Sequence, residues 1–372
     1  MVMTSPAVPL TARLHDEIKT TGPMRVSRFM HTCLFDDQDG YYHKGTAIGA
    51  TGDFITAPEV SQIFGEMLAA MLAYIAPYFA GAEAGFRFEA GPGRGTLAAD
   101  MQRGYEMCGS ELAQRPLYLL EKSDGFQDQQ KARLSETSLV MIDDVANLPP
   151  APLFGVANEF FDALGVDQII WQDGQWHHRL VGTSGDELCF VTGPRCTADE
   201  LIPYAPLPAA PTDGDICEYS PLSDTIMTQL AQHIAQNGGA LLVIDYGKSD
   251  QLGDTLQAVA NHRPVSPLSD CGAADITHWV DFRQLGQVAE AAQARLIGPV
   301  PQGRFLLELG IAERAEALRH KDMPEQDRQL LAAIDRLVSP AQMGQAFKVG
   351  LLVPQGDGVP PGFASYQTEG DR

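Results

Sequence analysis

The sequence has few basic residues for its size, and its charge is strongly one-sided. Its 372 residues contain 26 lysines and arginines against 48 aspartates and glutamates, which gives a formal net charge of −22. The densest basic spots, 177–179 and 319–321, are short. Affinity for nucleic acid comes from Lys and Arg side chains that neutralise phosphates, so this composition argues against a nucleic-acid-binding protein. An acidic surface is compatible with a cationic protein partner.

The sequence also lacks the cysteine spacings and the long apolar runs that mark several other classes of protein. Its six cysteines form no Cys-x-x-Cys pair, and no histidine stands at zinc-ligand spacing from them, so we predict reduced thiols and no metal site. No apolar run approaches the 18 residues of a membrane span, so none is expected. The first 11 residues carry no targeting signature, and we therefore expect a cytoplasmic protein.

The most informative feature that is present is a glycine-rich stretch, Glu89–Thr96, which contains Gly91, Gly93 and Gly95. It follows a short alternating segment, 86–88, and opens a helical one, 97–103, so we predict a strand, a glycine turn and a helix. Glycines allow tight turns and let a ligand approach the backbone closely. Their spacing differs from the Gly-x-Gly-x-x-Gly of dinucleotide binders. An acidic residue two positions before the first glycine suits a cationic ligand such as S-adenosylmethionine (SAM), which carries an ammonium and a sulfonium group.

Five apolar runs each end in polar or acidic residues. In open α/β sheets ligands bind beyond the carboxyl ends of the strands, and an acid after the second strand bonds the ribose hydroxyls. Glu121 fits that role, and Asp143 or Asp144 could accept a hydrogen bond from the adenine amino group. The pattern predicts a doubly wound α/β fold with a buried, mostly parallel sheet. The five runs are 86–88, 117–120, 139–142, 153–157 and 240–244.

Two further apolar runs, 304–309 and 347–353, predict a final strand pair. Seven strands that close with an antiparallel pair fit a Rossmann-like class I methyltransferase sheet better than a six-stranded dehydrogenase sheet. On this basis we assign residues 81–164 and 216–356 to the sheet domain, and 357–372 to a frayed tail.

Two other regions are predicted outside this sheet. Residues 1–80 form an N-terminal helical layer, in which Thr56–Glu59 has the pattern of a capping box with proline in the first turn. Its loop 45–54 contains three glycines and is either a lid over the cofactor or an ordinary surface loop. Residues 165–215 form an insertion with a β-hairpin, whose Asp173-Gly174 pair predicts a type I′ turn.

Six longer motifs follow one another along the chain: Gly52–Glu66, Glu89–Thr96, Ala157–Leu164, Ile244–Gly247, Asp254–Leu256 and Val280–Phe282. Together, in this order, they resemble the MidA-like family of SAM-dependent methyltransferases over about 10–353. The resemblance implies a class I methyltransferase that binds SAM through Glu89, Thr96, Glu121 and the three glycines, with a lid at Asp53 and Phe54. Mitochondrial members are linked to assembly of respiratory complex I through symmetric dimethylation of an arginine on a core subunit. A protein substrate, such as a respiratory complex subunit, is therefore implied.

The residues just past the fourth strand are the candidate catalytic groups. We expect Glu159 and Asp162 to receive a guanidinium group, because carboxylates orient its planar fork through paired hydrogen bonds. Asn158 would then lie near the methionine part of SAM. Asp245 and Tyr246, past the fifth strand, and Glu59 are further candidates on the substrate side.

Three alternatives stay open at this point. The first is a SAM-binding assembly factor with little catalysis, in which Trp171 and Trp176 of the predicted hairpin supply a docking surface. The second is a small-molecule methyltransferase, and the third is a nicotinamide-dependent oxidoreductase, which the glycine spacing disfavours. The apolar helical stripes also leave room for a homodimer.

Overall fold

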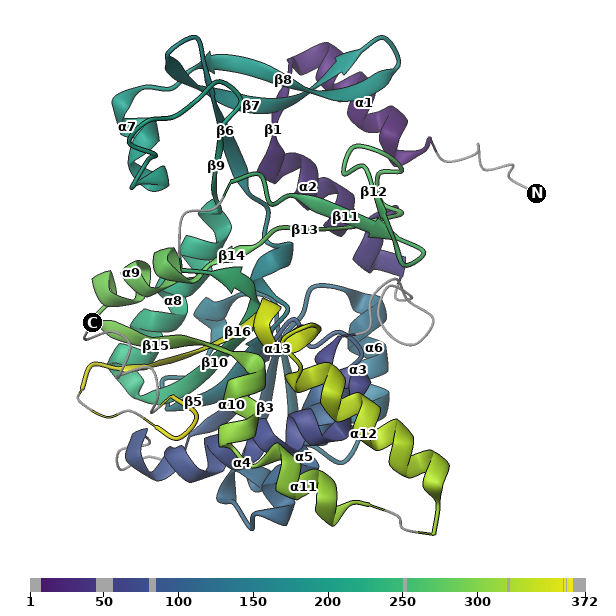
Figure 1. Ribbon diagram of the computed structural model, residues 1–372, viewed down its shortest axis with the longest axis vertical. Coiled ribbons are helices and arrows are strands. Elements are labelled where there is room, and N and C mark those ends of the chain that lie inside the picture. Colours follow the sequence, from purple (N-terminus) through teal and green to yellow (C-terminus); the bar gives the residue numbers. More distant parts are fainter. Residues whose placement is uncertain are drawn as a thin grey trace.

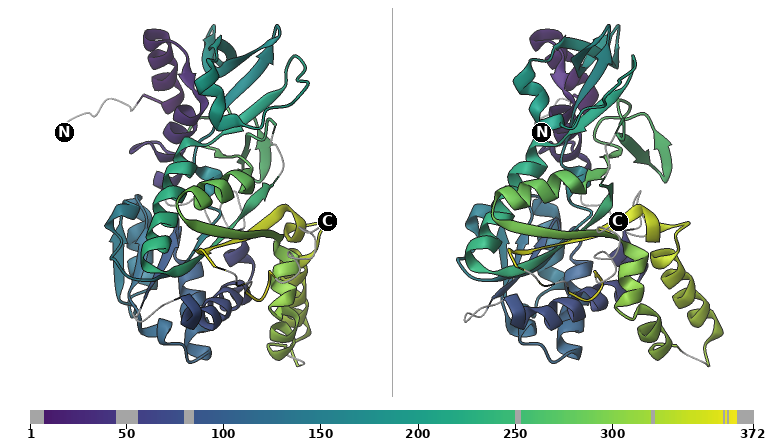
Figure 2. Two further views of the ribbon diagram at one scale, coloured as in Figure 1. Left: turned by 90° about the vertical axis from the view of Figure 1, so that its left-hand side faces the viewer. Right: turned by 60° about the vertical axis from the view of Figure 1, so that its left-hand side comes forward.

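The computed structural model describes residues 8–44, 56–79, 85–249, 253–319, 322–356, 358 and 360–363. Figure 1 shows a lower part built on a twisted sheet with helices on both faces, and an upper part of antiparallel strands and the first two helices. In the two views of Figure 2 the teal strands of the upper part stand clear of this sheet.

The sheet of the lower part has the strand order β15-β16-β10-β5-β2-β3-β4, with the short strand β14 beside β10. Neighbours from β10 through β5, β2 and β3 to β4 are parallel, and β16 is antiparallel to both β10 and β15. This order and the antiparallel closing pair confirm the predicted class I methyltransferase sheet. The strands are β2 (Phe86–Ala90), β3 (Leu117–Leu120), β4 (Leu139–Ile142), β5 (Leu153–Asn158), β10 (Gly239–Lys248), β14 (Val280–Asp281), β15 (Ala294–Pro301) and β16 (Phe347–Pro354).

One strand of that pair was predicted in the wrong place. Residues 304–309 do not form a strand; most of them lie in α10 (Gln302–Glu308), and β16 pairs with β15 instead. Phe305 and Leu306 are fully buried on the inner face of this helix, so their apolar run reflects helix packing. The true strand was hidden because Gly298-Pro299 interrupts its apolar pattern, where the register shifts between Ile297 and Val300.

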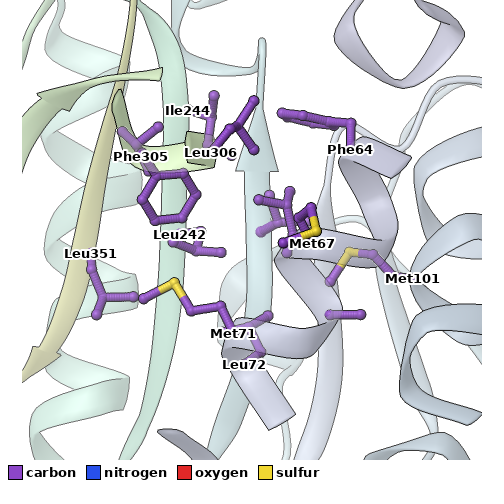
Figure 3. Packing of buried hydrophobic residues seen from close by; sticks show 14 of the residues in the cluster. Phe64, Met67, Met71, Leu72, Met101, Leu242, Ile244, Phe305, Leu306 and Leu351 are labelled. Atoms are coloured by element: carbon purple, nitrogen blue, oxygen red, sulfur yellow. The ribbon is translucent and has the colours of Figure 1, made fainter. Parts of the chain in front are cut away.

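The alternating side chains of β10 explain how both faces of the sheet are buried. Leu242 and Ile244 point into one apolar cluster, with α4 (Gln62–Phe79), α5 (Thr96–Met107) and α10. Leu241 and Val243 point into the opposite cluster, with α8 (Pro221–Asn237) and α9 (Phe282–Ala291). Figure 3 shows the first cluster, where Met67 and Met71 of α4 face Leu242 and Phe305.

Helix α4 is long and apolar enough to cross a membrane by length and composition alone. However, 56% of that stretch is buried inside the protein. Ile63, Phe64, Leu68 and Leu72 have no exposed surface, which is the behaviour of a core helix. The apolar character of α4 therefore reflects core packing.

The upper part joins three segments that are far apart in the sequence. Helices α1 (Leu10–Thr21) and α2 (Val26–Phe35) share an apolar cluster with residues of the insertion and of 256–276. A second sheet has the order β1-β7-β6-β9, with β8 beside β7. A three-stranded sheet, β12-β11-β13, lies beside it. These strands are β1 (Met24–Arg25), β6 (Asp167–Gln172), β7 (Gln175–Ser184), β8 (Glu187–Arg195), β9 (Ile216–Tyr219), β11 (Gln257–Ala260), β12 (Arg263–Val265) and β13 (Asp275–Thr277).

The hairpin of the insertion forms at the predicted residues. Asp173 and Gly174 both have positive φ angles, 51° and 76°, as a type I′ turn requires. The ring centroids of Trp171 and Trp176 lie 5.3 Å apart, and Trp176 is buried in a small cluster with Ile169 and Cys217. Trp176 therefore does not supply the exposed aromatic surface expected for docking. The domain boundaries drawn from the sequence stay a prediction.

Candidate active site

The glycine loop between β2 and α5 depends on backbone angles that side chains rarely adopt. Gly91, Gly93 and Gly95 have φ angles of 63°, 49° and 74°, in the left-handed region. A Cβ at Gly91 would also lie 2.9 Å from Cδ2 of Phe160. Glycine adopts these φ angles without strain, and at Gly91 it also avoids the contact with Phe160. This explains why glycine occurs at these three positions.

Glu89, at the end of β2, is a buried carboxylate with an unsatisfied atom. Only 4% of its surface is exposed, and its Oε2 has no hydrogen-bond partner among the described residues. Burial raises the pKa of Glu89 to about 8, and the nearby carboxylates of Asp100 and Glu121 add to the effect. A cationic hydrogen-bond donor at this position would satisfy the free oxygen and favour the ionised form.

Glu159 follows β5 in a strained backbone conformation, with a φ angle of 50°. Its amide donates to the carbonyl of Ile244 at 2.8 Å, while its Oε1 accepts from the amide of Ala57 at 3.2 Å and from Nδ2 of Asn158 at 3.1 Å. Burial raises the pKa of Glu159 to about 7. Oδ1 of Asn158 is buried without a partner among the described residues. The positions of the Asn158 and Glu159 side chains are therefore set by the end of β5.

These groups line one hollow at the carboxyl ends of β2 and β5. The strand order reverses between β2 and β5. From β2 the sheet continues in one direction to β3 and β4, and from β5 it continues in the other direction to β10. Ligands of open α/β sheets bind at such a switch point. The lining residues are Thr56, Pro58, Glu59, Glu89, Gly91, Pro92, Gly93, Arg94, Thr96, Leu97, Asn158 and Glu159.

The segment before α4 takes part in this hollow differently from the prediction. Thr56 begins the short helix α3 (Ala57–Val60), but its side chain makes no capping hydrogen bond, so the predicted capping box is wrong. Oε1 of Glu59 accepts instead from Oγ1 of Thr96 at 2.7 Å, and that hydroxyl also accepts from Nη1 of Arg133 at 2.9 Å. Glu59 thus ties α3 to the first residue of α5.

Glu121 lies at the carboxyl end of β3, next to the glycine loop. Its Oε1 accepts from the amide of Ser123 at 2.8 Å, and its Oε2 accepts from Nε2 of Gln130 at 3.3 Å. Burial raises the pKa of Glu121, whereas these hydrogen bonds lower it. Gln130, on α6 (Asp124–Arg133), was not selected from the sequence, because a glutamine in a polar helix gives no local signal.

Asp143 and Asp144, expected near adenine, are exposed and do not line the hollow. Asp143 accepts from Nδ2 of Asn147 at 3.1 Å, and Asp144 caps the following turn by accepting from the amide of Ala146 at 2.9 Å. Their contact with adenine stays a prediction. Asp53 and Phe54, the predicted lid residues, lie outside the described residues.

Asp245 has a clear structural contact. It is fully buried, and its Oδ2 accepts from the amides of Phe161 and Asp162 at 3.0 and 3.3 Å. It therefore holds the turn that carries Asp162. Burial raises the pKa of both carboxyl groups well above the usual range, and each lies close enough to other acids to be raised further. Tyr246, the next residue, packs on Phe347 with ring centroids 4.4 Å apart.

Two more residues act on this acidic site, and sequence reasoning missed both. Asp275, on β13, accepts from Oη of Tyr42 at 2.9 Å and raises the pKa of Glu159 and Asp162. Arg336, on α12 (Pro324–Val338), has the opposite effect and lowers the pKa of Glu159. Helix α12 packs against α3, whose Ala57 bonds Glu159. Each residue reaches the site from more than 100 positions away in the chain, so no motif could reveal it.

Comparison with known proteins decides which family this site belongs to. A family model described as "Putative S-adenosyl-L-methionine-dependent methyltransferase" matches residues 67–300. The chain belongs to this family.

Several relatives resemble the methyltransferase over nearly its whole length. Protein arginine methyltransferase NDUFAF7 of Rattus norvegicus is 34% identical, over 93% of this chain and 84% of the rat protein. The Homo sapiens protein is 32% identical, over 94% and 84%. The Drosophila melanogaster homologue is 30% identical, over 93% and 85%. A crystal structure from Burkholderia thailandensis, bound to S-adenosyl-homocysteine, superposes with a TM-score of 0.83 at 27% identity and covers 97% of this chain and 98% of its own.

These relatives correct one prediction. All three NDUFAF7 proteins are named as mitochondrial, which contradicts the cytoplasmic location expected from the sequence. That expectation rested on the composition of the first 11 residues, and the relatives show that it was wrong.

The residues of the site fit SAM, the cofactor of the family. The unpaired oxygens of Glu89 and Asn158 are acceptors, which suits an ammonium donor, and no phosphate group has to be neutralised. Gly91 and Gly93, in the left-handed turn, contribute only backbone to the lining of the hollow. Membership in the methyltransferase family also removes the nicotinamide-dependent oxidoreductase from the alternatives.

Proposed function

We propose that this methyltransferase methylates an arginine side chain of a protein. The observation that carries the proposal is a group of interacting carboxylates formed by Glu159, Asp162, Asp245 and Asp275, of which Glu159 lines the hollow together with the glycine loop. Burial raises the pKa of the first three of these acids, so a cation brought among them would be bound by their ionised forms. The relatives' name, protein arginine methyltransferase, supports the same substrate class.

On the cofactor side, each proposed contact follows from the donors and acceptors of the site. Glu89 would accept from the ammonium group of SAM, and Glu121 would accept from the ribose hydroxyls. The backbone of Gly91–Gly95 would pack closely against the ligand, with Thr96 at the start of α5. Asp143 and Asp144 are proposed to contact adenine.

On the substrate side, Glu159 is the proposed catalytic residue. Its Oε1 is held by Ala57 and Asn158, and its Oε2 has no hydrogen bond among the described residues. Oε2 can therefore accept from a guanidinium N–H, with Asp162 behind it as a second carboxylate. Because burial brings the pKa of Glu159 to about 7, its carboxylate can also take the proton that the methylated nitrogen loses.

When bound, SAM supplies an activated methyl group, so the protein chiefly has to align the acceptor nitrogen with it. The strained turn at Glu159 is suited to this task, because its position is fixed by β5 and α3 together. Asp245 would act through Asp162, whose amide it binds. We also propose that 45–54, with Asp53 and Phe54, is a lid over the cofactor, and that the insertion 165–215 docks the substrate protein.

We propose a core subunit of respiratory complex I as the substrate, as the resemblance to the MidA-like family implies. The test is incubation of the purified subunit with methyl-labelled SAM, followed by mass spectrometry of its peptides. The proposal predicts label on an arginine, and no label with Glu159→Gln. Label found only in the small-molecule fraction of a cell extract would favour a small-molecule methyltransferase. SAM binding without transfer to any fraction would favour the assembly-factor alternative.

A further inference from the structure

Gln130 is a buried amide that connects the two halves of the cofactor site. It lies on α6 with no exposed surface, and its Nε2 donates to the carbonyl of Gly93 at 2.7 Å. The same nitrogen donates to Oε2 of Glu121 at 3.3 Å. These two contacts join the glycine loop, after β2, to the carboxylate that follows β3.

The chemistry of the two partners fixes the orientation of this amide. A backbone carbonyl and an ionised carboxylate are both acceptors, and a side-chain amide has two N–H donors on one nitrogen. The reversed orientation would place Oε1 of Gln130 against both acceptors. Glutamic acid at this position would do the same, so the site needs the amide nitrogen in particular.

The other contacts of Glu121 show what the two hydrogen bonds of Gln130 add. Oε1 of Glu121 is held by the amide of Ser123, and its backbone carbonyl accepts from Nε2 of Gln127 at 3.0 Å. Among the side chains of the described residues, that of Gln130 is the one that donates to Oε2, the second carboxylate oxygen. Without it, Oε2 loses this hydrogen bond, and the carboxylate keeps the contact of Oε1 with Ser123.

We infer that Gln130 is a positioning residue for the cofactor: it sets the Glu121 carboxylate at a fixed distance from the glycine loop so that both can bind one SAM molecule. This inference rests on the proposed contact between Glu121 and the ribose hydroxyls. Gln130 contacts Glu121 and the glycine loop, and it is not proposed to contact the reacting atoms.

The effect of losing the bridge follows from the two hydrogen bonds. A hydrogen bond to a charged group contributes enough that its loss weakens binding by about tenfold to a hundredfold. Because the ribose contact depends on the position of Glu121, most of the loss falls on that contact. The KM for SAM is expected to rise, with kcat within a few fold of wild type.

The experiment is calorimetric titration of the full chain with S-adenosylhomocysteine and with its 2′,3′-dideoxyribose analogue. Wild type is expected to prefer the hydroxylated ligand, and Gln130→Glu to lose about tenfold or more of its affinity together with most of that preference. Gln127→Glu is the matched control, because it lies one turn earlier and bonds the backbone of Glu121 instead of its carboxylate. It should stay within a few fold of wild type. Gln130→Met, which keeps the volume, replaces Gln130→Glu if the latter does not fold.

The results separate the inference from the proposed role of Glu121. If wild type binds both ligands equally, the ribose contact itself is wrong. If wild type discriminates and the Gln130 variants discriminate equally well, Gln130 has no positioning role and the inference is overturned. Adding Gln130→Met to Glu121→Gln should cost little more than Glu121→Gln alone, and full additivity of the two losses would also overturn it.

Discussion

The backbone amide of Ala57 donates to Oε1 of Glu159 at 3.2 Å, which joins the first turn of α3 to the end of β5. The two residues are 102 positions apart in the chain. The contact places the N-terminal region directly against the proposed catalytic carboxylate. Helix α12 also packs against α3.

The pH dependence of the reaction should respond to Arg336. Burial raises the pKa of Glu159 to about 7, Asp275 raises it, and Arg336 lowers it. Arg336→Gln removes the positive charge, so the pKa of Glu159 rises further and less of it is ionised at a given pH. Because ionised Glu159 is proposed to receive the guanidinium, the acidic limb of kcat/KM should move to higher pH.

A pH–rate profile of the Arg336→Gln variant measures this shift directly. Arg336→Lys should restore the wild-type profile, since it keeps the charge. Arg328→Gln is the control, because Arg328 lies on the exposed side of the same helix and pairs with Glu325. An unchanged acidic limb in Arg336→Gln would show that Arg336 does not act on Glu159.

Gly93→Val should abolish SAM binding and leave the protein folded. A side chain at a φ angle of 49° costs roughly 1–2 kcal/mol. It would also occupy space where we propose that the ligand meets the loop. Gly109→Val isolates the strain, because Gly109 has a φ angle of 60° and a Cβ there meets no atom within 4 Å. Both variants should show similar small losses in thermal stability, and only Gly93→Val should fail to bind S-adenosylhomocysteine. Unchanged affinity in Gly93→Val would refute the close approach at this glycine.

Glu89 should make the ligand-free protein less stable as the pH rises. Its pKa is about 8 in the folded protein against 4.5 for an unperturbed glutamate, so folding favours its protonated form. That contribution is fully present below pH 4.5 and is lost as the pH rises through about 8, by up to roughly 5 kcal/mol. Glu89→Gln should therefore be more stable than wild type at pH 8 and bind S-adenosylhomocysteine more weakly. Urea unfolding at pH 5 and pH 8 tests this, and an equal pH dependence in both proteins would contradict it.

Local patterns predicted the central sheet well because buried strands and glycine turns leave clear signals. The run 240–244 and the loop Glu89–Thr96 were placed correctly for this reason. The strand at β15 was missed because Gly298-Pro299 breaks its apolar pattern, while Phe305 and Leu306 in α10 are equally apolar. Gln130 could not be found from the sequence, since its role depends on partners brought together by folding.

The most direct test of the account compares wild type with Glu159→Gln in two assays on the same preparation. Methyl transfer from labelled SAM to the protein substrate should be lost in the variant. Its affinity for S-adenosylhomocysteine in calorimetric titration should stay within a few fold of wild type, and NADH should not bind either protein. Transfer near the wild-type rate by folded Glu159→Gln would contradict the central claim that this carboxylate receives the substrate.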